Sequence, residues 1–575
     1  MTRKTTLIFI TLFVLLLGLG FDLYNRGAVW HLAWSVSGEE EPIAQLRGVV
    51  EWAGNLIRPQ PRTRPLVPIQ YTGYNPFGIN TFLQLESDPA KIEAQIQMIA
   101  DAGFTWIRQQ FEWAEIEVDG PALYIDSRND TNKDGLLQRG DRTSGWQKYD
   151  LIVALAEEYG LEIQARLDNP PLWVHARNPE IGAFAPPDDI QQFVDFAVAV
   201  ATRYRGRIRF YQVWNEPNIY PEWGNQPVNP EGYTELLCAT YHALKQVDPN
   251  IVVISGALAP TQALTGRDLN DFIFLQRMYQ AGAGDCFDIL SVQGYGLNSG
   301  PTDRRMRPTV VNVGRNQYIR DLMVANGDAH KPIWISEAAW NFVPPAAEAP
   351  DIAEPRNMFG QVTPQQAADY MPQLYQRAFE EWSWVGVINY WFFTRPTDEE
   401  RHQPFYYFRM VEPYYTPQNE LPFQPLPIYD AMRDYIASVV PTLYRGVHQI
   451  NDHWAIQTDG IAVTSPDAEF GDAMQVTQAQ FVAHGTDLFI RWQGDTLTVQ
   501  VDDQIHTFTQ ATNWQDAIVT LSLSAAPHNI IIYGENLLVD SITVDDRTFQ
   551  HLYPYVVIVM VGMLMLIVCV GGWVK

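Results

Sequence analysis

The sequence has few basic residues and few charged residues overall. Lys and Arg number 39 against 66 Asp and Glu, so the formal net charge is −27 at pH 7. A chain this acidic repels phosphate backbones, so no nucleic-acid partner is expected. Charged residues make up only 18% of the 575 residues and hydrophobic residues 46%, a balance that excludes global disorder.

Cysteine is also scarce. Three cysteines without a C-x-x-C pair exclude a disulfide-rich scaffold and a cysteine-based zinc site. Cys569 lies in an apolar run, which leaves Cys238 and Cys286. The sequence favours buried free thiols for these two, with a single disulfide as the alternative. Internal repeats, low-complexity tracts and a glycine-rich nucleotide-binding turn are missing as well.

Two long apolar runs predict membrane segments. The first, residues 5–20, follows Arg3 and Lys4 and is short for a hydrocarbon layer of ~30 Å. We interpret it as an uncleaved anchor; a cleaved signal peptide is the alternative, although no A-x-A site follows. The second, residues 555–574, is long enough to span and is followed by Lys575. The basic residues predict that both tails are cytoplasmic and that the body lies outside the membrane.

The chain divides into five expected regions. Residues 39–58 have apolar side chains at helical spacing, and the prolines of 59–68 indicate a stiff linker. The expected regions are an N-terminal transmembrane anchor or signal (1–24), a juxtamembrane helix with a Pro-rich linker (25–70), a barrel (71–445), a β-sandwich (446–551) and a C-terminal transmembrane helix (552–575).

Short apolar strands alternate with amphipathic helices from about residue 76 to 440. The expected strands are 78–82, 104–111, 160–167, 208–216, 250–257, 288–296, 332–339 and 386–393. Helices are expected at 89–103, 149–160, 189–206, 232–248 and 365–382. Such alternation is typical of a parallel sheet, and eight units favour a closed (β/α)8 TIM barrel. The alternative, an open doubly wound sheet, usually has the glycine-rich first turn that is missing here.

The pattern changes from about residue 450 to 550. Helical spacing fades, and short segments alternate apolar and polar residues between turn residues. This alternation predicts a β-sandwich, which resembles a jelly-roll module. We expect the module to pack on the barrel and space it from the membrane; glycan binding is the alternative.

Two predicted barrel strands end in a glutamate. The fourth strand ends in Trp-Asn-Glu-Pro at Glu216, and the seventh in Ile-Ser-Glu-Ala at Glu337. Active sites of such barrels lie at the carboxyl ends of the strands. Alone, Glu216 could be a surface residue and Glu337 could form a structural ion pair. Together, on facing strands, they suit retaining glycoside hydrolysis, which needs two carboxyl groups ~5–5.5 Å apart.

These motifs resemble clan A glycoside hydrolases, nearest to the family 39 and family 5 type. The resemblance covers residues 75–440 and implies that Glu216 is the acid/base and Glu337 the nucleophile. It also implies that Asn215 binds the sugar 2-hydroxyl. No cofactor is expected for catalysis.

The same resemblance assigns supporting roles to three other residues. Arg108 matches the strand-two arginine that pairs with the nucleophile, Tyr295 the strand-six tyrosine beside it, and Trp391 the strand-eight tryptophan under the sugar. Many members carry His two residues before that tyrosine, where this chain has Gln293. We expect Gln293 to contact substrate and the subsite to differ in detail.

Further aromatic and acidic residues are candidates for substrate binding. Asp168 and Trp173 follow the third strand and either line the site or shape a loop. Trp223 and Trp340 either stack on sugar faces or belong to the core. Aromatic rings suit both roles because they present a large apolar face.

The loop after the second strand contains a D-x-N-x-D-G motif. This segment resembles the calcium loops of EF-hand and dockerin modules. A structural Ca²⁺ is the expectation, and an Asp/Asn/Gly turn is the alternative, since the last position is Asp and no flanking helix pair is evident. The candidate ligands are Asp130, Asn132, Asp134, Leu136 and Asp141.

The sequence therefore predicts a retaining glycosidase that acts on a poly- or oligosaccharide outside the cytoplasmic membrane. The first alternative is a non-catalytic, membrane-anchored glycan-binding protein of the same fold. The second is a structural surface protein held by two spans. The sugar, the linkage and endo or exo action depend on loop shapes, which a single sequence does not determine.

Overall fold

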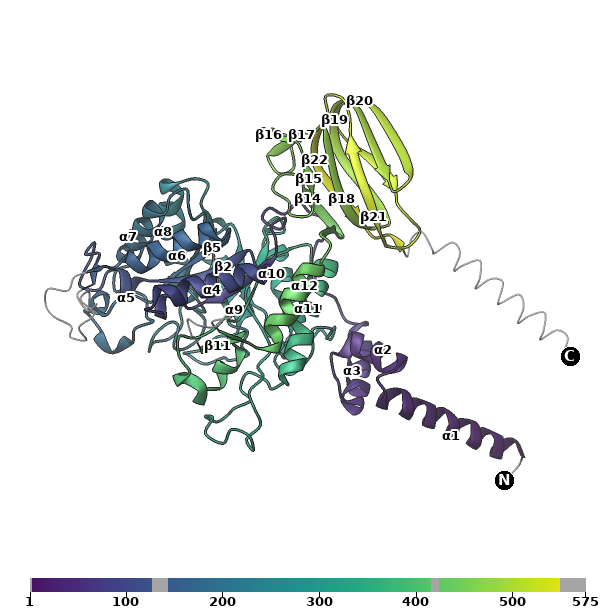
Figure 1. Cartoon of the computed structure of the whole chain (residues 1–575), viewed down its shortest axis with the longest axis horizontal. Coiled ribbons are helices and arrows are strands. Elements are labelled where there is room, and N and C mark those ends of the chain that lie inside the picture. The colour runs from purple at the N-terminus through teal and green to yellow at the C-terminus, as the bar shows by residue number, and fades with distance from the viewer. Residues whose placement is uncertain (1–2, 127–142, 415–422, 549–575) are drawn as a thin grey trace.

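The computed structural model describes residues 3–126, 143–414 and 423–548. Figure 1 shows a central barrel, a separate sheet that follows it in the chain, and an N-terminal helix that projects away from both. The candidate calcium ligands and the C-terminal apolar run lie outside the described residues, so both remain predictions.

Eight parallel strands form the barrel, as the sequence predicted. Their order is β7-β6-β5-β2-β1-β10-β9-β8, and isolated bridges join Ile254 to Ile289 and Leu258 to Val292, which closes the sheet between β7 and β8. The strands are β1 (Phe77–Thr81), β2 (Trp106–Glu112), β5 (Glu162–Asp168), β6 (Phe210–Val213), β7 (Val252–Ile254), β8 (Leu290–Gln293), β9 (Ile333–Ala338) and β10 (Val385–Tyr390).

Helices follow most barrel strands and surround them. Their apolar faces pack inward, and their starts carry the expected caps: Asp189 accepts from the N–H of Gln191, and Thr363 and Gln366 form a capping box. The helices are α4 (Pro89–Asp101), α6 (Gln147–Glu158), α7 (Ile190–Arg203), α8 (Pro230–Val247), α9 (Asp271–Gln280), α10 (Asn316–Ala325), α11 (Pro364–Glu381) and α12 (Pro427–Ser438).

The smaller elements lie in loops. They include the single-turn helix α5 (Trp113–Ile116) and two short antiparallel pairs. The pairs are β3 (Ile125–Asp126) with β4 (Thr143–Ser144), and β11 (Val411–Glu412) with β12 (Gln424–Pro425).

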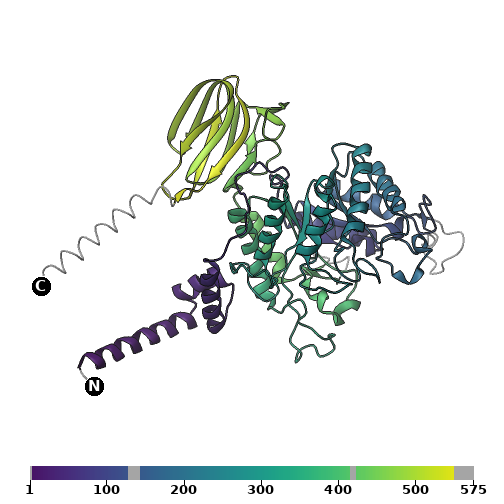
Figure 2. The ribbon, with the colours of Figure 1, turned by 180° about the vertical axis from the view of Figure 1, so that it is seen from behind.

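A separate sheet of ten strands follows the barrel, with an apolar core of its own that includes Leu488, Trp492 and Ile532. All of its pairings are antiparallel except that of β13 with β18. The sheet curls, as Figure 2 shows from behind. Its strands are β13 (Thr442–Leu443), β14 (Gly446–Gln449), β15 (Gln457–Thr458), β16 (Ile461–Thr464), β17 (Asp472–Gln475), β18 (Gln478–Gly485), β19 (Asp487–Val501), β20 (Gln504–Thr520), β21 (Ala526–Tyr533) and β22 (Leu538–Asp545).

Three helices precede the barrel. They are α1 (Arg3–Tyr24), α2 (Ala28–Ser37) and α3 (Pro42–Asn55). Within the described residues, no single helix meets the length and hydropathy that a membrane span requires; the bent pair Ile10–Tyr24 and Ala28–Ser37, at 63°, meets them jointly.

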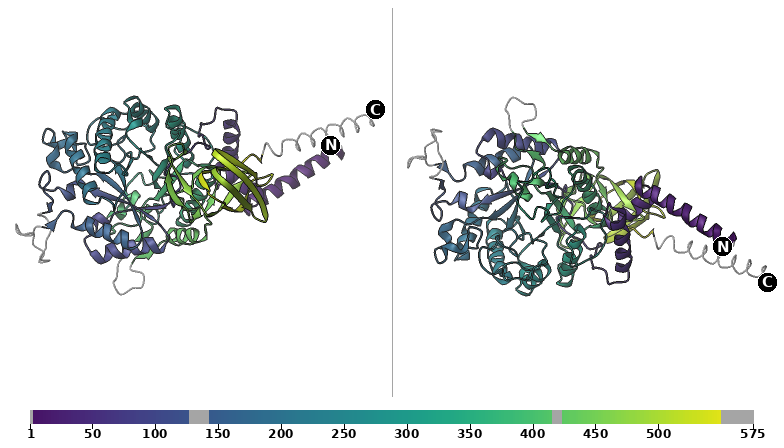
Figure 3. Two further views of the ribbon diagram at one scale, coloured as in Figure 1. Left: turned by 90° about the horizontal axis from the view of Figure 1, so that it is seen from above. Right: turned by 90° about the horizontal axis from the view of Figure 1, so that it is seen from below.

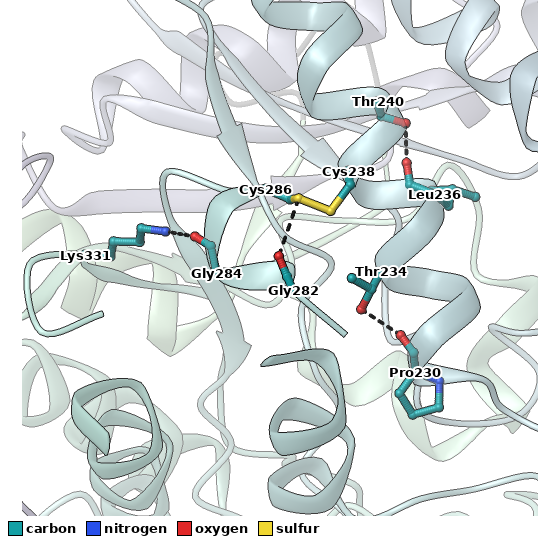
Figure 4. Close-up of a disulfide and its surroundings, with 9 residues drawn as sticks. All are labelled: Pro230, Thr234, Leu236, Cys238, Thr240, Gly282, Gly284, Cys286 and Lys331. Atoms are coloured by element: carbon teal, nitrogen blue, oxygen red, sulfur yellow. Dashed lines mark hydrogen bonds between the residues drawn. A yellow bond between two sulfur atoms is a disulfide. The ribbon is translucent and has the colours of Figure 1, made fainter. Parts of the chain in front are cut away.

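A disulfide joins Cys238 to Cys286 (Figure 4), where the sequence favoured free thiols. Cys238 lies on α8, and Cys286 follows a short turn that packs against α8 and precedes β8. This packing brings the two Cα atoms to 4.7 Å. The sequence could not show the pairing because it depends on which helix lies beside that turn.

We expect the disulfide to stabilise the barrel measurably. The two cysteines are 48 residues apart, and closing a loop of this length is worth about 4 kcal/mol in the chain-entropy account. Reduction, or the pair Cys238→Ser and Cys286→Ser, should lower the free energy of unfolding by about that amount. Urea denaturation followed by tryptophan fluorescence measures it. The double-serine protein is the control, because reductant should not change its midpoint; equal wild-type midpoints with and without reductant would contradict the expectation.

Candidate active site

The carboxyl ends of β6 and β9 place two glutamates at the same end of the barrel. Glu337 lies on β9, and Glu216 follows β6. The backbone near them is strained: φ is 72° at Trp214, 41° at Glu216 and 54° at Asn169, which follows β5. Non-glycine residues rarely adopt such angles, and they concentrate at functional sites. Three residues in such a conformation therefore lie at this end of the barrel, beside the glutamate pair.

Glu337 is buried, at 3% exposure, and both of its carboxylate oxygens accept hydrogen bonds. The Tyr295 hydroxyl donates to Oε2 at 2.7 Å, and Arg108 Nη1 donates to Oε1 at 3.0 Å. These are the two partners that the sequence predicted, and they come from β2 and from the loop after β8. Burial lowers the pKa of Arg108 to about 10, so the guanidinium is still charged at neutral pH.

Arg108 also holds the amide next to the second glutamate. Its Nη2 donates to Asn215 Oδ1 at 2.8 Å, its Nη1 to Asn80 Oδ1 at 2.6 Å and its Nε to Gln212 Oε1 at 2.8 Å. All three nitrogens of the guanidinium donate to buried acceptors, so Arg108 and Asn215 are held in place. The sequence analysis missed Asn80 and Gln212; the available signal was an amide inside an otherwise apolar strand.

Glu216 is linked to Glu337 through the neighbouring strand. Gln293 on β8 pairs in register with Glu337, and its Nε2 donates to Glu216 Oε1 at 3.2 Å. Burial, followed by the negative charges of Glu337 and Glu222, raises the pKa of Glu216 well above its ordinary value. The Gln293 hydrogen bond acts in the opposite direction. The arrangement favours a protonated Glu216 beside a second carboxyl group.

Replacing Gln293 should change the pH dependence of any reaction that uses Glu216 as an acid. Its N–H stabilises the charged form of Glu216, so the change Gln293→Met should raise the pKa of Glu216 further. A general acid works only below its pKa, so the alkaline limb of kcat/KM should move to higher pH. A pH profile measures the shift. Gln293→Glu is the matched comparison, since added negative charge should move the limb the same way; a limb unchanged in both would contradict this role.

A third acidic residue, Glu222, lies close enough to influence the pair, although the sequence analysis did not select it. Burial raises its pKa to about 7, and the Arg166 guanidinium opposes that rise. Arg166 forms an ion pair with Asp168, whose Oδ1 also accepts from Gln110 Nε2 at 2.6 Å. Asp168 is therefore buried within a polar network at the end of β5, and its role in substrate binding remains a prediction.

Two of the predicted tryptophan platforms are core residues. Trp340 is 1% exposed, and its indole N–H donates to the Ser299 carbonyl at 2.8 Å. Trp223 is also buried and packs edge-on against Trp214 and Tyr233. Neither ring leaves a face open for a sugar, so the core alternative is correct for both.

The other two predicted tryptophans are half-buried. Trp173 packs edge-on against Trp113, and its N–H donates to the Glu117 carbonyl at 2.8 Å. Trp391 follows β10, and its backbone N–H donates at 3.1 Å to the carbonyl of Ala338, one residue beyond Glu337. Trp391 is therefore positioned beside the predicted nucleophile with part of its surface exposed.

Among the described residues, no group of three or more His, Cys, Asp or Glu side chains could hold a metal ion. A cavity of about 1090 Å³ lies at the amino end of the barrel, between Arg209 and Trp454, away from the glutamate pair. Hydrogen bonds and strain, rather than a large cavity, identify the candidate site.

No family model matches the chain, and no curated protein does either. Several solved structures are distantly similar. A family 39 glycoside hydrolase from Bacteroides cellulosilyticus WH2 is 15% identical with a TM-score of 0.46, over 79% of this chain and 80% of that one. A GH39 β-xylosidase from Caulobacter crescentus is 15% identical with a TM-score of 0.42, over 83% and 98%. A glucosidase from Croceicoccus marinus is 12% identical with a TM-score of 0.44, over 81% and 98%.

Proposed function

We propose that the protein is a retaining glycoside hydrolase that cleaves O-glycosidic bonds of a poly- or oligosaccharide. The observation that carries this proposal is the linked pair of glutamates. Arg108 and Tyr295 hold Glu337, Gln293 connects it to Glu216, and Glu216 has a raised pKa. Two carboxyl groups in different environments are what acid-assisted double displacement requires.

In the first step, a carboxylate oxygen of Glu337 attacks the anomeric carbon. The bond from that carbon to the leaving oxygen breaks, and the proton of Glu216 passes to the leaving oxygen. A covalent glycosyl-enzyme forms, and Glu216 becomes a carboxylate. Arg108 holds Asn215 in position to contact the sugar 2-hydroxyl, where hydrogen bonds strengthen in the transition state.

In the second step, Glu216 acts as a base. It takes a proton from a water molecule whose oxygen attacks the anomeric carbon, and the bond to Glu337 breaks. Glu337 leaves as a carboxylate, and Glu216 regains its proton. Two inversions give net retention.

The surroundings of Glu337 favour a nucleophile over a base that activates water. An inverting enzyme needs a carboxylate with room for water, and its two carboxyl groups lie ~6.5–9.5 Å apart. Glu337 is buried, and both of its oxygens already accept bonds from Arg108 and Tyr295. The charge of Glu337 also raises the pKa of Glu216, which requires the two groups to be near each other.

The competing function is non-catalytic glycan binding. A binding protein needs neither a raised pKa at Glu216 nor strained backbone beside it. A panel of fluorogenic glycosides, assayed with wild type and Glu337→Gln, separates the two functions. Turnover by the wild type that the variant loses supports hydrolysis. Equal inactivity of both proteins, with saturable binding to a glycan array, would support binding instead.

The proposed setting is the outer face of a membrane. A disulfide persists in oxidising compartments, which supports an extracytoplasmic barrel. The exposed apolar side chains of α1 support insertion of that helix into lipid, and the apolar run at 555–574 would supply the second anchor. We propose that the curled sheet is a jelly-roll type of module that spaces the barrel from the bilayer.

A further inference from the structure

Within the hairpin formed by α2 and α3, helix α3 buries polar residues and exposes several large apolar ones. Gln45 is 1% exposed, and its Nε2 donates to the Trp30 carbonyl of α2 at 3.3 Å; Asn55 is also buried. Three large apolar side chains of α3 are exposed: Ile43 by 78%, Leu46 by 67% and Val50 by 65%. Amphipathic surface helices ordinarily bury the apolar stripe, so the outer face of this hairpin needs a partner.

The inner side of the hairpin is fixed to the barrel by charge pairs. Arg305, in the loop after β8, is buried and pairs with Glu39 at 2.6 Å and with Glu51 at 3.4 Å. The Tyr370 hydroxyl on α11 donates to Glu40 at 2.7 Å, and the Trp34 ring packs on the Tyr370 ring. These part-buried, charge-assisted contacts attach the hairpin to the barrel.

The hairpin presents a set of exposed apolar residues, which we call the apolar face. Monomeric soluble proteins rarely expose such patches unless they bind a partner or a membrane. The apolar face consists of Leu32, Ile43, Leu46, Val50, Leu56 and Ile57.

The exposed charges beside the apolar face are mainly basic. Arg47 and Arg58 are exposed, with one exposed carboxylate, Glu41, whereas Glu39 and Glu51 pair toward the barrel. Basic residues that flank an apolar helix face match anionic lipid headgroups. This charge distribution favours a lipid surface as the partner.

The apolar face also adjoins α1. The Asp22 carboxylate, near the end of α1, accepts from the N–H groups of Val29 and Trp30 at the start of α2, at 3.0 and 3.1 Å. The side chains from Leu12 to Leu17 are all exposed, an unbroken apolar stretch longer than one turn. Figure 3 shows α1 leaving the body at the hairpin. A lipid bilayer that takes up α1 would therefore have its surface at the hairpin.

We propose that the apolar face lies in the headgroup region of a lipid bilayer and fixes the orientation of the barrel on the membrane. Interfacial helices bury their apolar face by about 5–10 Å at this boundary. The inference rests on the proposed anchoring by α1, but not on the proposed glycosidase chemistry. If the apolar face lies in the bilayer surface, the barrel is held at a set angle to the membrane; without that contact, a flexible linker would leave its orientation free.

The test places a fluorescent label on the apolar face of the full chain. Leu46→Cys, in a Cys569→Ser background that keeps the Cys238–Cys286 disulfide, takes an NBD group, and the protein is reconstituted in phosphatidylcholine/phosphatidylglycerol vesicles. The matched control is Leu172→Cys, since Leu172 is also 67% exposed. Leu172 follows β5, across the barrel from β9, and β9 is the strand that precedes α11 and its contact with the hairpin. We expect lipids with a shallow doxyl group to quench the label at position 46 at least twofold more than the label at position 172.

Each other outcome overturns the proposal. If the chain floats with vesicles but doxyl lipids do not quench position 46, the face is not in lipid. If that label is also shielded from iodide, a second copy or another protein covers it. If the chain does not float, both the anchoring and the interfacial hairpin are wrong. Glycosidase activity measured in detergent is independent of these results, so failure here and failure of the proposed function remain distinct.

Discussion

The change Glu337→Gln is expected to lower kcat/KM on the order of 10⁴-fold or more, since losses of this size follow removal of a covalent nucleophile. The amide keeps the shape of the side chain but cannot attack the anomeric carbon. It also leaves the buried guanidinium of Arg108 without its counter-charge. Steady-state kinetics on the best fluorogenic substrate measures the loss.

Two controls separate lost chemistry from lost structure. Removing one partner of a buried ion pair costs about 3–5 kcal/mol, so urea denaturation must show that the variant is still folded at the assay temperature. Glu222→Gln removes a nearby carboxyl group that has no assigned step, and it should retain most of the activity.

Azide rescue tests the nucleophile independently. In Glu337→Ala, azide should restore turnover and give a glycosyl azide of inverted configuration. Full activity of Glu337→Gln, or equal loss in Glu222→Gln, would contradict the assignment.

The second large effect is expected for Glu216→Ala and should depend on the leaving group. General acid catalysis contributes about 10²–10⁴-fold, so kcat/KM for sugar or alkyl leaving groups should fall within that range. A dinitrophenolate leaves without protonation, so cleavage of dinitrophenyl glycosides should fall far less at the first step. A series of aryl glycosides of different leaving-group pKa measures the dependence.

The pH profile gives a second reading of Glu216. The pKa of Glu216 is raised in the folded protein. The contribution of Glu216 as an acid to wild-type kcat/KM is therefore fully present below that pKa and is lost as pH rises through it. In Glu216→Ala this alkaline limb should disappear, and azide should yield a product of retained configuration. An equal loss for all leaving groups, with the limb unchanged, would exclude Glu216 as the acid.

The barrel and the core of its site were predictable because their signals are local. Strand and helix periodicity is read within a dozen residues, and the carboxyl ends of parallel strands necessarily meet at one end of a closed sheet. Glu216 and Glu337 therefore had to lie at the same end once the strands were recognised. The hydrogen bonds of Arg108 and Tyr295 to Glu337 agree with the roles that the resemblance to clan A glycoside hydrolases implied.

The features that the sequence did not predict depend on contacts between distant segments. Trp223 and Trp340 occur in motifs that could face a ligand, and only the packing of Tyr233 and Tyr370 against them shows that they are core. Residues 39–58 were expected to be helical, but their spacing could not show that Gln45 would be buried against Trp30 of α2.

The most direct test of the central claim is to trap the covalent intermediate. A 2-fluoro glycoside with a fluoride or dinitrophenyl leaving group, chosen from the substrate panel, should react once per barrel because the fluorine slows hydrolysis of the glycosyl-enzyme. Mass spectrometry of the digested protein should place the added fluorosugar on the peptide that contains Glu337. An adduct on another carboxylate such as Glu222, or normal turnover with inverted product and no adduct, would contradict the account.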